Sequence, residues 1–161
     1  MSRKVLLPTL VASLLLSLGA VAAFARATNA LGSWKLDLGK SSYGSMRAPK
    51  SEEMTITTDT RDALAWSLKG MTADGKTYTE SYDGPIDGQY HPLASDEPGM
   101  TVAYTRAPKG NVTWTIKDKT GAVFETGSAM VSANGKTLKL KGTMQGPNGK
   151  SNFVSVYRKA Q

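Results

Sequence analysis

Apolar and polar residues alternate along most of the chain beyond residue 30, with the period of two that is typical of half-buried β-strands. Trp34, Leu36 and Leu38 fall on one face of such a strand, and Lys35 and Asp37 fall on the other. The same alternation recurs in the runs 54–58, 64–68, 78–82, 102–104, 112–116 and 138–141. Helical periodicity does not occur in this part of the sequence. The pattern therefore predicts eight or nine β-strands.

Turn signals separate these runs at short intervals. Asp74-Gly75, Asp87-Gly88 and Asn134-Gly135 are dipeptides that supply the positive φ values of tight hairpins. Hairpins in sequence order must bury their apolar faces together, and closing the sheet also removes exposed edges. We therefore expect an all-β fold, an up-and-down antiparallel barrel whose interior is filled by side chains or holds one small ligand.

Two stretches depart from simple alternation. Gly127 interrupts one predicted strand and indicates a bulge or a sharp bend. In the last run, Phe153 and Tyr157 compete with Val154 and Val156 for the inward face. The facing of that final strand stays open at this point.

The first 25 residues have the pattern of a secretory signal peptide. Arg3-Lys4 precedes an uncharged, largely apolar stretch that ends in Ala23-Phe24-Ala25, a small-residue motif of the kind that signal peptidase recognises. Polar and helix-breaking residues interrupt the stretch, which argues against a permanent membrane anchor. We expect residues 1–25 to be a cleaved signal peptide and residues 26–161 to form one barrel domain. That domain would be periplasmic or secreted from a bacterium and would not span a membrane.

Composition narrows the function classes. The chain has no cysteine, which excludes disulfides, lipid attachment to cysteine and thiolate zinc sites. Its net charge of +7 comes from lysines and arginines that are scattered along strands and turns. A scattered pattern favours a solvated outer face over a nucleic-acid site, and export argues further against nucleic acid as a partner. An anionic surface of the cell envelope remains a candidate partner for that face.

The start of the predicted barrel resembles a known family. Gly32-Ser33-Trp34 opens the first strand as Gly-x-Trp does in lipocalins and other calycins. Further similarity to exported bacterial proteins of lipocalin-like kind lies in residues 132–138 and 142–157. The resemblance implies a lipocalin-like barrel in which Trp34 closes the base and Arg158 stacks on its indole as a cation–π pair. It implies no reaction.

Candidate binding residues follow from the inward face. Glu80 stands between Tyr78 and Tyr82, so a carboxylate flanked by two phenols would face the lumen and could orient a ligand. Glu80 could instead be paired with Arg106 in a purely structural role. The other residues predicted to line an aromatic lumen are Trp66, Tyr104, Trp114 and Phe124.

Residue combinations typical of catalysis are absent from the sequence. His91 is the only histidine, and it lies in the longest connection, residues 84–99, with no second histidine or cysteine to share a metal. No serine near it has nucleophile-elbow spacing, and no glycine-rich loop follows a strand and opens a helix. We therefore expect no catalysis, no metal and no cofactor.

The sequence leaves two functional hypotheses. In the first, the barrel binds a small apolar or amphipathic molecule in its lumen without a catalytic step. In the second, the interior is filled, and the protein is a structural or interaction component of the cell envelope. It would then act through its basic outer face or through the 84–99 connection.

Overall fold

The computed structural model describes residues 30–107, 110–146 and 148–160. These residues form one antiparallel sheet of eleven β-strands and a separate 3-10 helix of three residues. The elements in chain order are β1 (Gly32–Leu36), η1 (Leu38–Lys40), β2 (Ser51–Asp59), β3 (Ala63–Met71), β4 (Thr77–Pro85), β5 (His91–Pro92), β6 (Ala94–Ser95), β7 (Thr101–Arg106), β8 (Val112–Lys117), β9 (Val123–Val131), β10 (Thr137–Gly146) and β11 (Gly149–Lys159).

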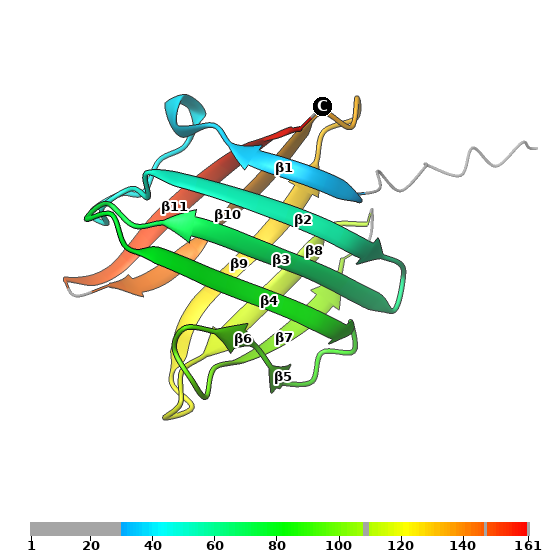
Figure 1. The fold of residues 1–161 in the computed structure, drawn as a ribbon. Helices are drawn as coiled ribbons and strands as arrows, with labels where there is room; N and C mark the ends of the chain where they lie inside the picture. The colour runs from blue at the N-terminus through cyan, green and yellow to red at the C-terminus, as the bar shows by residue number, and fades with distance from the viewer. Residues whose placement is uncertain (1–29, 108–109, 147, 161) are drawn as a thin grey trace, which may run out of the picture.

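The sheet curls into a nearly closed barrel. Its strands follow the order β5-β7-β8-β9-β10-β11-β1-β2-β3-β4-β6, and Figure 1 shows β1 to β4 crossing in front of β8 to β11. The prediction of an all-β antiparallel barrel is confirmed at this level. The predicted number of eight or nine strands is wrong, because the described residues form eleven.

The two additional strands lie where the barrel meets itself. His91 and Pro92 pair with Val102 and Thr101 of β7, whereas Ala94 and Ser95 pair with Ser81 and Glu80 of β4. Between these two short pairings, the side chain of Leu93 is 4% exposed. The segment 91–95 therefore bridges the gap between β4 and β7. Runs of two residues are too short to show a period, which is why the sequence indicated only a connection here.

The core lies inside the curl of the sheet. Its most deeply buried large side chains are Trp34, Val102, Leu138 and Tyr157, from four different strands. Trp34, Val102 and Leu138 come from inward positions of the predicted alternation, whereas Tyr157 belongs to the strand whose facing the sequence left open. Burying a large apolar side chain contributes about 1.5–3 kcal/mol to stability. The neighbouring outward positions in β10 carry exposed lysines, such as Lys139.

The first strand ends earlier than its sequence pattern predicts. Leu38 lies in η1 and is 43% exposed, so it does not share the buried face of Trp34 and Leu36. The chain leaves the ladder at Asp37 and returns to it where Ser42 pairs with Val154 of β11. Because η1 bulges out of the sheet between these points, the alternation is interrupted.

The position of η1 also explains which side chains of β11 are buried. Phe153 and Tyr157 face the interior, whereas Val154 lies on the outer side. Val156 is also buried, although alternation places it outward, because η1 packs against β11 and the amide of Asp37 donates a hydrogen bond to its carbonyl at 2.7 Å. Both faces of this strand are covered, which explains why its sequence was apolar on both.

The expected bulge at Gly127 lies elsewhere. Gly127 pairs regularly with Trp114 and Gly142, and the irregularity in β9 falls at Phe124, which has no partner opposite it in β8. The glycine serves a close approach instead. A Cβ at position 127 would lie 2.2 Å from Cζ2 of Trp114, so only glycine lets the indole lie against this strand.

Trp34 is buried on the inward face of β1, as the alternation predicted, and the cation beside its ring is Lys159. Trp34 is 1% exposed, and its indole nitrogen donates a hydrogen bond to the carbonyl of Ala30 at 2.8 Å. The Nζ of Lys159 lies 5.3 Å from the centre of the ring. Gly32 has a φ of +115°, and a Cβ there would lie 3.1 Å from Cε of Lys159.

The prediction that Arg158 stacks on the indole is wrong. Trp34 pairs with Lys159 in the ladder, and residues directly opposite one another point to the same side of a sheet. Arg158 is opposite Lys35 and therefore points outward, where its Nε donates a hydrogen bond to Asp37 at 2.6 Å. The register of β1 and β11 therefore places Lys159, the residue after Arg158, beside the indole of Trp34.

The predicted signal peptide, residues 1–25, lies outside the described residues, so its removal stays a prediction. Within the described ranges, no helix has the length and apolar character needed to cross a membrane.

Candidate functional site

The interior of the barrel contains a cavity of about 630 Å³. Inward side chains of β2, β3, β4 and β7 to β11 line it, including the apolar residues Met54, Leu68, Leu140 and Phe153. Pockets that hold small molecules have volumes of roughly 300–1,000 Å³ and mostly apolar walls. The cavity has the size and the lining of such a pocket.

Five of the six aromatic residues that the sequence predicted for the lumen line the cavity. They are Trp66, Tyr78, Tyr104, Trp114 and Phe124. Tyr82 does not line it. Its ring packs 4.8 Å from that of Tyr104, and its hydroxyl donates a hydrogen bond to the carbonyl of Pro85 at 2.7 Å. Tyr82 faces inward as expected but is a core residue.

Hydrogen bonds fix the orientation of the two indoles in the cavity wall. The indole nitrogen of Trp66 donates to the hydroxyl of Tyr104 at 3.0 Å, and that of Trp114 donates to Oε1 of Glu125 at 2.7 Å. Buried indole N–H groups need such partners, because an unpaired donor would cost free energy. The aromatic faces are therefore held in place around the cavity.

Glycines on neighbouring strands let two of these rings lie close to the sheet. Tyr78 is opposite Gly70, where a Cβ would come within 2.3 Å of Cζ of the phenol. Trp114 is opposite Gly127 in the same way. Because these rings fold onto the wall, they leave space in the centre of the barrel.

Glu52 is a site residue that we did not predict. Its two carboxylate oxygens accept hydrogen bonds from the hydroxyls of Tyr78 and Tyr157. A signal for it was present, since Met54 and Ile56 are inward residues of the same strand and a period of two extends back to Glu52.

Glu80 lines the cavity, and among the described residues its carboxylate has no hydrogen-bond or ion-pair partner. Burial, together with the charge of Glu52, raises the pKa of Glu80 to about 7. A carboxyl group with this pKa is divided between its neutral and charged forms near neutral pH.

Glu125 is the third carboxyl group in the interior. Burial raises its pKa to about 8, the charges of Glu80 and Glu52 act in the same direction, and the hydrogen bond from Trp114 opposes them. We did not predict Glu125, because the bulge at Phe124 breaks the alternation that would have placed it inward. Both residues line the cavity.

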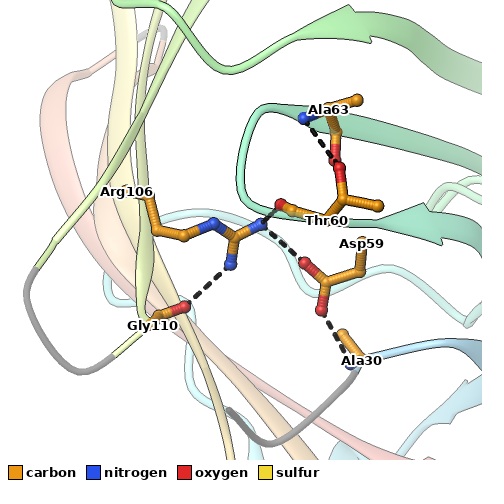
Figure 2. A network of polar contacts seen from close by, with 6 residues as sticks. All are labelled: Ala30, Asp59, Thr60, Ala63, Arg106 and Gly110. Carbon is orange, nitrogen blue, oxygen red and sulfur yellow. Dashed lines mark hydrogen bonds and ion pairs between the residues drawn. The ribbon is translucent and has the colours of Figure 1, made fainter.

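Arg106 forms a different contact from the one considered at the sequence level. Its guanidinium binds Asp59 at 2.7 Å and donates hydrogen bonds to the carbonyls of Thr60 and Gly110 at 2.6 and 2.9 Å, as Figure 2 shows. The other oxygen of Asp59 accepts a hydrogen bond from the amide of Ala30 at 2.8 Å. This network ties β7 to the β2–β3 turn and to the start of the chain's described part, so Arg106 is not the partner of Glu80.

His91 lies in β5, away from the cavity lining. Its Nε2 is 3.0 Å from Oδ1 of Asp87 in a partly exposed pair. Among the residues that the structure describes, no group of three or more histidine, aspartate or glutamate side chains is arranged to hold a metal ion.

Comparison of the chain with protein-family models, with curated proteins and with solved structures finds no match. The resemblance to lipocalin-like proteins therefore stays a prediction from the sequence, and the site is characterised by its own geometry.

Proposed function

We propose that this protein is a lipocalin-like carrier or receptor that binds a small, partly apolar molecule in the lumen of its barrel and performs no chemical step. The observation that supports the proposal is the cavity of about 630 Å³ with an apolar and aromatic wall. Burial of apolar ligand surface against such a wall would provide most of the affinity. The predicted export signal places this activity in the periplasm or outside the cell.

The second hypothesis, a structural or interaction protein of the cell envelope, requires a barrel interior filled by side chains. A filled interior leaves no room for a ligand, whereas this one contains space of ligand size. We therefore favour ligand binding over action through the basic outer face.

A substitution that fills the cavity tests the proposal. Ala129 lines the cavity from β9, so Ala129→Phe would place a ring in the space that a ligand needs. Thr126 lies on the same strand but is exposed, so Thr126→Phe is the matched control that adds the same ring outside. Binding of the uncharged fluorescent probe N-phenyl-1-naphthylamine would be measured for all three proteins, with circular dichroism to verify the fold.

We expect the probe to bind to the wild type and to Thr126→Phe, and to lose most of its affinity for Ala129→Phe. Equal binding by a folded Ala129→Phe, or no binding by the wild type, would contradict the proposal. Native mass spectrometry of the protein purified from its source organism adds a second measurement, in which a retained small molecule is the expected result.

A further inference from the structure

The cavity differs in charge from the rest of the protein. Of the 13 acidic residues in the chain, seven line the cavity, whereas the described part of the chain contributes only two of the 20 basic residues to its lining. No lysine is among the lining residues that the structure describes. Although the chain has a net charge of +7, acidic residues outnumber basic residues in the described lining of its cavity.

The acidic residues are distributed over the interior and both ends of the cavity. Glu52, Glu80 and Glu125 lie in the interior, in strands β2, β4 and β9. Asp59 lies in the network with Arg106. The remaining three are the exposed residues Asp74, Asp96 and Glu97.

Neither arginine of the lining compensates the interior glutamates. Arg106 is paired with Asp59 at 2.7 Å. Arg47 is exposed, and its charge acts on Asp74, whose pKa it helps to lower. Within the described residues, Glu80 and Glu125 thus have no cation as a partner, and both are half-buried side chains that line the cavity.

The remaining titratable groups of the cavity are tyrosines. Burial raises the pKa of Tyr43, Tyr78, Tyr104 and Tyr157, so these phenols stay uncharged. Their rings, together with those of the two tryptophans, carry negative faces that attract cations. Aromatic rings and carboxylates therefore favour a ligand of the same charge.

We propose that the ligand of the cavity is an organic ammonium ion with an apolar body, held by Glu80 and Glu125 and by the aromatic rings around them. This inference rests on the proposed function and specifies its ligand class. The apolar body would lie against Met54, Leu68 and Phe153, and the ammonium group would provide the positive charge that the interior lacks. The protein's net positive charge opposes this only weakly, since salt screens it beyond about 8 Å under physiological conditions.

Proton linkage follows from this arrangement. Near neutral pH, Glu125 in the free cavity is mostly protonated and Glu80 is divided between its protonated and ionised forms, because burial raises the pKa of these groups to about 8 and about 7. A cation prefers the ionised carboxylates and displaces those protons. Its affinity should therefore rise with pH, by up to about tenfold per pH unit for each carboxyl group that must lose a proton.

The experiment compares two probes of the same shape. The first is the 1-naphthylmethyl-trimethylammonium ion, and the second is its uncharged carbon isostere, 1-neopentylnaphthalene. Dissociation constants would be measured by naphthalene fluorescence, from mildly acidic to mildly alkaline pH, with the full-length mature protein. At alkaline pH we expect the ammonium ion to bind at least about tenfold more tightly than the isostere.

Glutamine variants identify the residues responsible. Glu80→Gln and Glu125→Gln should each weaken binding of the ammonium ion and flatten its pH dependence, while leaving the isostere unaffected. Glu53→Gln is the matched control, because Glu53 belongs to β2 beside Glu52 but faces outward, where it lies 3.6 Å from Lys35. It removes the same charge and should change neither dissociation constant.

The outcomes separate this inference from the proposed function. If the isostere binds as tightly as the ammonium ion at every pH, the ligand class is wrong and the ligand-binding barrel stands. If the cavity-filling variant retains both probes, binding occurs outside the lumen and both proposals fall. A cation preference that survives Glu80→Gln and Glu125→Gln would likewise overturn the assignment to these residues.

Discussion

Replacing Glu125 by glutamine tests the electrostatics of the cavity with little change in shape. The indole nitrogen of Trp114 donates to the carboxylate at 2.7 Å, and the amide oxygen of a glutamine can accept the same hydrogen bond. The variant cannot ionise. In the wild type, burial raises the pKa of Glu125 from its ordinary value of 4.5 to about 8.

The sign of the effect follows from the protons bound in each state. Between pH 4.5 and about pH 8, the native protein keeps a proton on Glu125 that the unfolded chain has released. The free energy of unfolding therefore has its full value below pH 4.5 and falls as the pH rises to the pKa of Glu125 in the folded protein. One excess proton gives a slope of about −1.4 kcal/mol per pH unit in the free energy of unfolding.

The expected magnitude is a difference that grows with pH. The full pKa shift corresponds to an upper limit of about 5 kcal/mol, and water in the cavity reduces this value. We therefore expect the free energy of unfolding of Glu125→Gln, relative to the wild type, to rise by about 2–4 kcal/mol between pH 4.5 and pH 8. Urea denaturation followed by circular dichroism over this range measures it. Glu53→Gln, an exposed residue, should run parallel to the wild type. If Glu125→Gln also runs parallel, the carboxyl group is not protonated in the native barrel and the reasoning fails.

Two further substitutions test the framework around the cavity. Arg106→Met leaves the carboxylate of Asp59 buried without its cation, so it should lower the free energy of unfolding, measured with denaturant, by about 3–5 kcal/mol. A decrease below about 1 kcal/mol would show that the network in Figure 2 contributes little to stability. Gly127→Ala places a Cβ 2.2 Å from the indole of Trp114, so it should lower the free energy of unfolding by about 1–3 kcal/mol and shift the tryptophan fluorescence. An unchanged emission spectrum would mean that the ring does not lie against this glycine.

Much of the wall of the site could be predicted from the sequence. Residues 78–82 alternate over five positions, and this was enough to place Tyr78 and Glu80 inside, where the structure has them. Glu52 carries an equivalent signal, because it lies two residues before the inward Met54 in β2. Glu125 had no usable signal, because the unpaired Phe124 shifts the phase of its strand. Such bulges depend on the neighbouring strand and cannot be recognised from one segment alone.

The amino-acid sequence by itself determined the local character of this protein. The period of two predicted β-strands, the glycine turns predicted the hairpins between them, and Trp34 was assigned to the buried face, because these properties depend on neighbours within a few positions. The tertiary structure alone decided which distant groups meet. Tyr157 reaches Glu52 across 105 positions, Arg106 reaches Asp59 across 47, and Lys159 rather than Arg158 covers Trp34. The physical reason is that contacts across a barrel depend on strand register and curvature, which the whole sheet sets together.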